Sequence, residues 1–297
     1  MTTPEPTTPE PTMPALTNLA GRTLIMSGGS RGIGEAIAVK AARAGANVAL
    51  IAKTAEPHPK LPGTIFTAAQ AIEEAGGKAL PIVGDIRDDE QLDAAIARTV
   101  EQFGGIDIVV NNASALDLTP SADISMKRYD LMQDINARGA FSLSTKCIPH
   151  LRKSANPHIL TLSPPIIVAP AWFKEVPTAY TISKFSMSLV TLGLASELDA
   201  DGIAANSLWP RTTIATAAVS NILGEALVSR SRTVDIMADA ALSIISKPSS
   251  AATGQCFIDE EVLVADGLTD LSGYQVDPAV ARHDLELDFW MEWPDKR

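Results

Sequence analysis

The chain has 297 residues, of which 46% are hydrophobic and 20% charged, so it can build a large globular core. Its formal net charge of −11 and its lack of a basic cluster argue against a protein that binds nucleic acid. The only cysteines, Cys147 and Cys256, form neither a zinc motif nor a disulfide framework, and His58 and His150 have no metal-like partners. We therefore expect a reducing compartment and no metal site.

The first segment, "MTTPEPTTPEPTMP", repeats Pro, Thr and Glu without periodic apolar residues. Such a segment cannot bury enough surface to offset its ordering entropy, so we expect residues 1–18 to be a disordered tail. The segment lacks the basic start and apolar centre of a secretory signal. No later stretch has eighteen uninterrupted apolar residues. These features predict a cytoplasmic protein without stable membrane insertion.

From residue 22 onward, short apolar runs typical of strands alternate with helical patterns. Strands are expected at residues 23–27, 47–52, 78–83, 106–113, 158–163 and 203–209. Helices are expected at 32–44, 89–103, in a long region ending near His150, and at 178–199, and an apolar run at 254–263 closes the series. Continuous apolar strands between helices indicate a parallel sheet covered on both faces. The prediction is an α/β Rossmann fold, a doubly wound sheet of about seven strands, in one domain over 19–268 with residues 269–297 as a separate C-terminal extension.

A glycine-rich turn, "SGGSRGIG", joins the first strand to the first helix. Gly28 permits a tight turn, and the missing side chains of Gly32 and Gly34 allow close approach of a dinucleotide to the helix start. The free N–H groups and the helix dipole there favour a pyrophosphate. The expected cofactor contacts in this motif are Ser27, Gly28, Ser30, Arg31, Gly32, Ile33 and Gly34. A purely structural turn and a methyltransferase remain alternatives.

The stretch "TLSPPIIVAPAWFKEVPTAYTISK" offers a second set of reactive side chains. Tyr180 and Lys184 are four residues apart on a predicted helix, so they share one face, although such a pair is often only a surface pair. An ammonium beside a phenol lowers the phenol pKa from about 10 and allows proton exchange near neutral pH. Ser163 ends its strand where α/β folds place ligands, and it could hold a substrate oxygen or simply form a turn.

Taken together, these motifs resemble the short-chain dehydrogenase/reductase family. The glycine turn, "NNAS" at 111–114, Asn136 in "DINARG", Ser163 and "YTISK" occur in the order of that family over residues 22 to about 265. The resemblance implies NAD(P)-dependent interconversion of alcohols and carbonyls, with Tyr180 as acid/base and Lys184 also binding the nicotinamide ribose. It further implies a water relay anchored by Asn136. The further cofactor contacts that it implies are Asn112, Ala113 and Thr213.

Three departures from the family pattern concern the site. Ser114 replaces a usual glycine, "WPRT" at 209–212 replaces a usual Pro-Gly, and the interval from Ser163 to Tyr180 is longer than usual. Pro164 and Pro165 would stiffen this longer excursion while leaving the serine at its strand end. One subgroup of the family shares "LSPP", "CIPHLRKS" and "AKTAEPHPKLPGTI" with this chain. We therefore expect the catalytic residues to be intact and the segment between Ser163 and Tyr180 to form a specialised cover, or roof, over the substrate pocket.

The residue after the second strand indicates which dinucleotide is used. A carboxylate there would accept hydrogen bonds from the ribose hydroxyls of NAD, but this chain has Lys53, with Arg31 nearby. Two cations suit the 2′-phosphate of NADP, unless both are merely solvated charges. NADP is therefore predicted in preference to NAD. Asp85 is expected to meet the adenine amino group, its alternative being a helix cap.

Apolar residues in two segments predict a hydrophobic small-molecule substrate. They are Ile166, Ile167, Val168, Trp172 and Phe173 in the first segment, and Ile214, Ala218, Ile222 and Leu223 in the second. A long aliphatic, isoprenoid or fatty alcohol or carbonyl fits such a pocket, although an amphipathic core helix explains the second segment equally well. The family resemblance implies a homodimer or homotetramer that pairs through the tyrosine helix, and the apolar residues Phe185, Leu189, Leu192 and Ala195 fit such an interface unless the rest of the chain covers them. A catalytically silent dinucleotide-binding regulator or scaffold is the alternative function.

Overall fold

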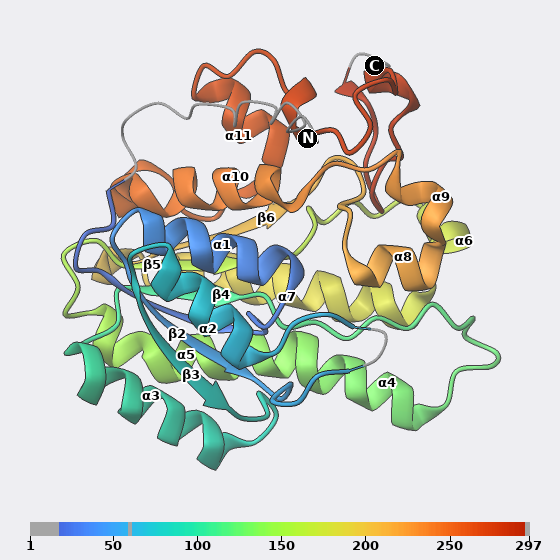
Figure 1. The fold of residues 1–297 in the computed structure, drawn as a ribbon. Helices are drawn as coiled ribbons and strands as arrows, with labels where there is room; N and C mark the ends of the chain where they lie inside the picture. The colour runs from blue at the N-terminus through green and yellow to red at the C-terminus, as the bar shows by residue number, and fades with distance from the viewer. Residues whose placement is uncertain (1–17, 59–60, 295–297) are drawn as a thin grey trace.

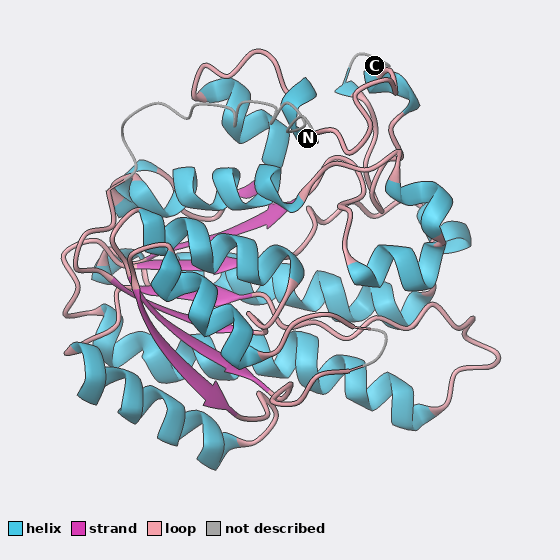
Figure 2. Cartoon of the chain, viewed as in Figure 1, coloured by secondary structure: helices cyan, strands magenta, loops and turns pink. Residues whose placement is uncertain are grey.

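The computed structural model describes residues 18–58 and 61–294 of the chain (Figure 1). Seven parallel strands form one sheet in the order β3-β2-β1-β4-β5-β6-β7, which confirms the predicted Rossmann fold (Figure 2). The strands are β1 (Thr23–Ser27), β2 (Asn47–Ala52), β3 (Lys78–Val83), β4 (Ile108–Asn111), β5 (His158–Thr161), β6 (Ala204–Trp209) and β7 (Cys256–Ile258). The tail expected at residues 1–18 lies, except for Asn18, outside the described residues.

Helices cover both faces of this sheet, as expected from strands with buried residues on both sides. One face packs against α1 (Gly32–Arg43), α2 (Ile65–Glu74), α10 (Val234–Ser246) and α11 (Asp259–Ala265). The other face packs against α3 (Asp89–Phe103), α5 (Gly139–Leu151) and α7 (Thr178–Glu197). Shorter helices lie outside these two layers: α4 (Met126–Met132), α6 (Trp172–Glu175), α8 (Ala217–Leu223) and α9 (Glu225–Val228). The strands point their carboxyl ends toward one edge, where ligands of such sheets bind.

Several elements differ from the sequence prediction: α2 was not expected, and β4, β5 and β6 are shorter than the runs expected at 106–113, 158–163 and 203–209. Two further differences concern the long helix before His150 and the run at 254–263. The long helix expected before His150 contains a π-helical stretch over Gln133–Arg138, between α4 and α5. The run at 254–263 divides into the short strand β7 and the helix α11, because Asp259, Glu260 and Glu261 occupy the first turn of α11. Carboxylates stabilise a helix amino end through the helix dipole, so these residues favour helix over continued strand.

The residues expected to form a separate C-terminal extension, as far as residue 294, pack against the domain. Tyr274, Trp290 and Trp293 are each at most 2% exposed. We call Leu285–Trp293 the C-terminal strap. Its Leu287 forms an antiparallel bridge with Thr212, just beyond the end of β6. The strap therefore lies across the carboxyl edge of the sheet, where Figure 1 shows it in red beside α8 and α9.

Candidate active site

Close contacts of the backbone explain the glycines of the turn between β1 and α1. Gly28 has φ +78°, and a Cβ on it would lie 2.7 Å from the Cα of Ala113. A Cβ on Gly34 would lie 2.8 Å from the carbonyl oxygen of Gly28. The side chain of Asn112 fills the remaining space and donates to that same oxygen at 2.6 Å. The turn is thus held directly against the loop that follows β4.

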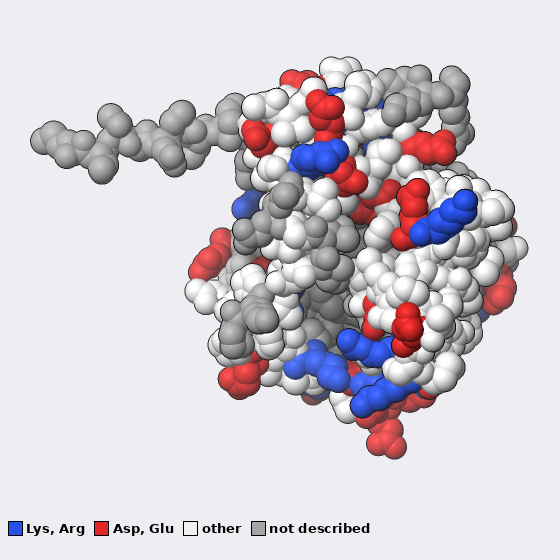
Figure 3. All heavy atoms as spheres, turned by 90° about the vertical axis from the view of Figure 1, so that its right-hand side faces the viewer, with Lys and Arg blue, Asp and Glu red and all other residues white. Residues whose placement is uncertain are grey.

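A groove of about 580 Å³ runs along this edge of the sheet from the glycine turn. The expected cofactor contacts that line it are Gly28, Ser30, Arg31, Gly32, Ile33, Lys53, Asp85, Asn112 and Ala113. Ser27 lies beneath it and accepts a hydrogen bond from the backbone N–H of Ala113 at 3.2 Å. Gly34 packs under the turn. Figure 3 views this edge of the molecule, which is hollowed near its centre and carries basic side chains below the hollow.

Ion pairs occupy the end of the groove beyond β2. Lys53 lies 3.0 Å from Asp85, whose carboxylate also contacts Arg87 at 2.6 Å. Hydrogen bonding from Arg87 holds the pKa of Asp85 well below its usual range. Arg31 donates to the carbonyl oxygens of Pro62 and Gly63 at 2.9 and 3.0 Å. Asp85, expected at the adenine, is therefore a paired carboxylate in this structure.

Tyr180 and Lys184 lie one turn apart on α7, and both are buried. The Lys184 amine donates to the carbonyl oxygen of Leu162 at 2.6 Å and lies 4.9 Å from the centre of the Trp209 ring. Burial lowers the pKa of Lys184 to about 7. Burial, followed by the charge of Asp288, raises the pKa of Tyr180. The expected lowering of the tyrosine pKa by Lys184 is therefore absent here, because burial outweighs any effect of an amine held on Leu162.

Ser163 and Asn136, the other two expected catalytic residues, differ in how their polar groups are satisfied. Ser163 is fully buried, and its hydroxyl has no hydrogen-bond partner among the described residues. The Asn136 amide donates to the carbonyl oxygen of Ala115 and to the hydroxyl of Ser183, both at 2.9 Å. Its oxygen accepts from the N–H of Ala115 at 2.7 Å. Asn136 thus ties the loop after β4 to the tyrosine helix from within the π-helical stretch, a distortion common at functional sites.

A second cavity, of about 220 Å³, adjoins Tyr180 and is largely apolar. It is lined by Leu116, Leu118, Tyr180, Trp209, Thr213, Val219, Leu227, Glu286, Leu287, Asp288 and Phe289. Thr213, expected at the cofactor, lies in this wall and shares a 2.8 Å hydrogen bond with Ser231. Ile214, expected in the pocket, is instead 2% exposed within the core beside α10.

The other residues expected to form the roof of the pocket divide into three groups. Ile167 and Trp172 pack in the cluster around Tyr180, whereas Val168 and Phe173 are 74% and 42% exposed. Ile166 is half-buried and does not line the cavity. The side chains of Ala218, Ile222 and Leu223 lie outside the described part of the structure.

Sequence reasoning missed the strap as part of this site. Trp290 stacks on Tyr180 with 6.0 Å between ring centres, and Phe289 meets the same ring edge-on at 6.2 Å. Trp290 also has φ +64°, an uncommon backbone conformation for a bulky residue. The signal available in the sequence was the aromatic content of "DFWMEW", which its charged neighbours obscured.

Known proteins identify the class to which this site belongs. A profile described as short chain dehydrogenase matches residues 22–225, so the chain belongs to the short-chain dehydrogenase family and is an oxidoreductase. The chain is 54% identical over 274 residues to hydroxysteroid dehydrogenase-like protein 2 of Danio rerio. The matched region covers 92% of this chain and 65% of that protein, so this chain spans less than two thirds of the relative's length. The human protein of that name is 50% identical over 278 residues, or 93% and 65% of the two chains.

A solved structure agrees with this assignment. The short chain dehydrogenase of Mycobacterium thermoresistibile is 56% identical, with a TM-score of 0.88 over 93% of this chain and 97% of that one. Within residues 18–58 and 61–294, no cluster of His, Cys, Asp or Glu could hold a metal ion. No helix of the same residues is long and apolar enough to cross a membrane.

Proposed function

We propose that this chain is an NADP(H)-dependent oxidoreductase that interconverts a hydrophobic alcohol and its carbonyl, with Tyr180 as acid/base. One observation carries the proposal: Tyr180 lies in the wall of an apolar cavity, and its helix neighbour Lys184 reaches the end of β5 at the edge where the groove lies. A reacting carbon in the cavity would therefore lie between a proton-transferring group and the groove.

The groove suits a nicotinamide dinucleotide. Its glycine turn leaves no room for side chains, and its volume of about 580 Å³ lies within the range of ligand sites in proteins. When bound, the dinucleotide would supply or accept the hydride. The backbone N–H groups at the start of α1 would hold its pyrophosphate, as they do in other dinucleotide-binding turns.

The chain's own residues would manage the oxygen and the proton. Ser163 has a buried, unpartnered hydroxyl, which a substrate oxygen could satisfy. As an alcohol is oxidised, its hydroxyl proton would pass to the phenolate of Tyr180, and in reduction the phenol would return it. Burial opposes the phenolate in the structure, so the proposal requires that the charged form of Lys184, which its pKa of about 7 leaves partly populated at neutral pH, comes to favour the phenolate once the site is filled. Asn136 would anchor a relay that exchanges this proton with water.

The charges beyond β2 support NADP over NAD. Lys53 directly follows β2, and its side chain is 62% exposed at the groove. A 2′-phosphate could draw Lys53 away from Asp85, because that carboxylate would keep its ion pair with Arg87. The half-buried Arg31 offers a second cation on the same side.

Two further proposals concern the setting of the protein. Both Cys147 and Cys256 are free thiols, which supports a cytoplasmic location. A homodimer or homotetramer is proposed from the exposed apolar residues of α7, of which Leu189 is 59% exposed. The partner of the site itself is a hydrophobic small molecule, not a nucleic acid.

Replacement of the tyrosine tests the proposed function. Tyr180→Phe removes only the hydroxyl, so hydride transfer should fall at least about a hundredfold while NADPH affinity stays nearly constant. Affinity is read from tryptophan fluorescence, and turnover from nicotinamide absorbance with a panel of apolar aldehydes and alcohols. Near-normal turnover in the variant would rule out Tyr180 as the acid/base. NADPH binding without turnover in the wild-type protein would instead support the silent regulator.

A further inference from the structure

Arg211 ties the C-terminal strap to the edge of the sheet. This residue belongs to the "WPRT" sequence that departs from the usual family pattern, and it is 6% exposed. Its guanidinium donates to the carbonyl oxygen of Glu292 at 2.8 Å and pairs with Glu260 at 3.2 Å. It also pairs with Glu261. Arg211, which stands where the family pattern differs, thus holds the C-terminal strap through buried contacts.

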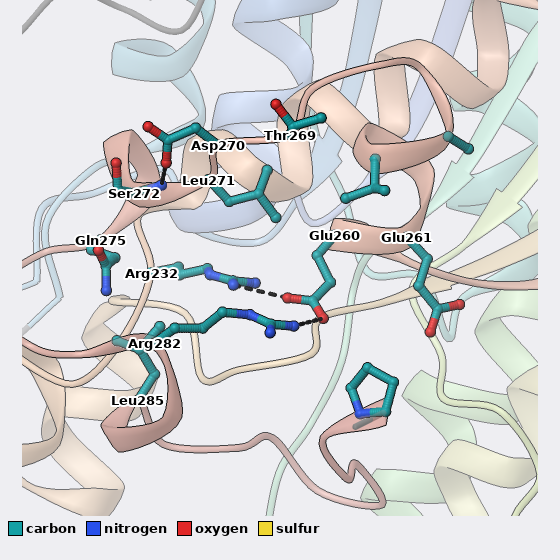
Figure 4. Close-up of a pocket in the computed structure, with 13 residues that line it drawn as sticks. Arg232, Glu260, Glu261, Thr269, Asp270, Leu271, Ser272, Gln275, Arg282 and Leu285 are labelled. Atoms are coloured by element: carbon teal, nitrogen blue, oxygen red, sulfur yellow. Dashed lines mark hydrogen bonds and ion pairs between the residues drawn. The ribbon is translucent and has the colours of Figure 1, made fainter. Parts of the chain in front are cut away.

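Glu260 is the centre of this anchor. Besides Arg211, its carboxylate pairs with Arg232 at 2.8 Å and with Arg282 at 3.4 Å. Figure 4 shows Arg232 and Arg282 converging on Glu260 from one side. Arg282 also lies 4.7 Å from the ring centre of Trp293. Buried charges with several partners fix the strap in one position, because any other position would leave them unpaired.

Backbone hydrogen bonds hold the strap against the residues that follow β6. The N–H of Thr213 donates to the carbonyl oxygen of Glu286 at 2.9 Å, and the N–H of Asp288 donates to that of Arg211 at 3.1 Å. Glu286 and Asp288 line the cavity that contains Tyr180, together with Leu287 and Phe289. The strap therefore supplies both carboxylates of an otherwise largely apolar site.

The two carboxylates differ in their surroundings. Glu286 pairs with Arg230 at 3.1 Å, whereas Asp288 makes no ion pair with any described residue. The Asp288 carboxylate accepts from the N–H of Phe289 at 2.8 Å, and a hydrogen bond from the Trp209 side chain also favours its charged form, so both of these donors are uncharged. The charged groups whose fields reach it are Lys184 of α7 and Asp259 of α11. Asp288 thus carries the less compensated of the two charges at the cavity.

We propose that Asp288 is a specificity-determining residue that makes the cavity accept uncharged alcohols and carbonyls and reject those that carry a carboxylate. The inference rests on the proposed function, because it assumes that the substrate enters the cavity beside Tyr180. Two like charges brought together at a partly dehydrated site repel strongly, so an acid-bearing substrate would bind poorly. The volume of about 220 Å³ is below the usual range for drug-sized ligands, which further favours a compact substrate.

Removal of this one charge tests the proposal. Wild type, Asp288→Asn and the matched control Glu286→Gln would be assayed with NADPH on 6-oxohexanoate and on its methyl ester. The ratio of kcat/KM for the ester to that for the acid should fall about tenfold in Asp288→Asn, as expected for loss of one repulsive contact. It should change less than about twofold in Glu286→Gln, whose charge is already paired. An unchanged ratio in Asp288→Asn would overturn the assignment.

A binding measurement separates this inference from the proposed function. Hexanoate and hexanamide would be titrated calorimetrically into the three proteins loaded with NADPH. Hexanoate should bind about tenfold more tightly to Asp288→Asn than to wild type, with hexanamide unchanged. This result without turnover of any aldehyde would support Asp288 while rejecting the oxidoreductase proposal. Equal hexanoate affinity in wild type and variant would reject the role of Asp288 whatever the turnover.

A pH series provides a test without substitution. Burial raises the pKa of Asp288 to about 7, so its charge disappears as pH falls from about 8 to about 6. Hexanoate, with a pKa near that of a glutamate at about 4.3, stays ionised over this range. Its binding to wild type should therefore improve as pH falls. Protonation of Lys184 also improves hexanoate binding as pH falls. The contribution of Asp288 is therefore the difference between wild type and Asp288→Asn in how steeply hexanoate affinity changes with pH. Equal pH dependence of the two proteins would contradict the proposal.

Discussion

Lys184 shows, at the scale of one residue, how burial of an amine acts against stability. The side chain is 3% exposed, and burial brings the amine pKa from an ordinary 10.5 to about 7. Between these values the unfolded chain binds a proton that the folded chain does not, so the contribution of Lys184 to stability rises with pH. Below about pH 7 both states are protonated and the full cost of the buried charge remains.

An apolar substitute at this position should therefore stabilise the fold. Lys184→Met is expected to raise the free energy of unfolding by about 1–3 kcal/mol near pH 6.5, with the gain shrinking toward pH 10. Urea unfolding at several pH values measures this, and Lys174→Met on the exposed surface of α6 is the control. A loss of stability, or a gain that does not vary with pH, would contradict the interpretation of Lys184 as a desolvated amine.

Lys53 determines the expected cofactor preference. Lys53→Asp should raise the KM for NADPH at least about tenfold and lower that for NADH, because a carboxylate repels the 2′-phosphate and accepts from a free ribose hydroxyl. Part of the NADPH preference should remain through Arg31. Initial rates with both cofactors measure the change, with Lys127→Asp on α4, outside the groove, as the control. A wild-type preference for NADH would show that Lys53 does not bind a phosphate.

At the scale of elements, the strap depends on its anchor. Arg211→Met leaves Glu260 with fewer partners and releases the carbonyl oxygen of Glu292, so we expect a loss of about 2–4 kcal/mol in unfolding free energy. Arg230→Met, which breaks the exposed pair with Glu286, should cost less than about 1 kcal/mol. Chemical denaturation compares the two. Equal small losses would mean that the buried network does not hold the strap.

Local sequence patterns were sufficient to predict the strands of the sheet and the glycine turn. The runs that became β1, β2 and β3 matched the prediction at both ends, because β1 and β2 are almost wholly buried and β3 directly follows the glycine pair at 76 and 77. The π-helical stretch at Asn136 could not be predicted in this way, since the side chain bonds to Ala115 and Ser183, which are distant in sequence. The strap was missed for the same reason.

The candidate site was predictable to a similar extent. Resemblance to a family placed Tyr180, Lys184 and Ser163 at the carboxyl edge of the sheet, where the structure brings them. It could not show that Thr213 pairs with the strap and lies in the wall of the cavity beside Tyr180, because this pairing joins segments that are distant in sequence. Nor could it show the burial of Tyr180, which comes from Trp290 and Phe289.

At the scale of the whole molecule, an apolar surface remains on the layer formed by α5 and α7. Phe141, Ile182 and Leu189 are 51%, 42% and 59% exposed, whereas Ala195, expected on the same surface, is buried. A multiple of 31.3 kDa is therefore expected from light scattering at micromolar concentration, and Leu189→Lys should shift the protein toward the monomer. Leu268→Lys, which lies outside this layer, is the control. A mass near 31 kDa in wild type, unchanged by NADPH, would contradict self-association through α7.

The order in which a ribosome makes the chain gives the strap a further consequence. The glycine turn, α7 and β6 leave the ribosome before Leu285–Trp293, yet the strap covers Tyr180 and completes the cavity. A nascent chain that has reached α11 can already form the groove along the sheet. Its tyrosine is still open to water at that stage. The groove proposed for the dinucleotide is thus completed earlier in synthesis than the cavity wall proposed to select the substrate.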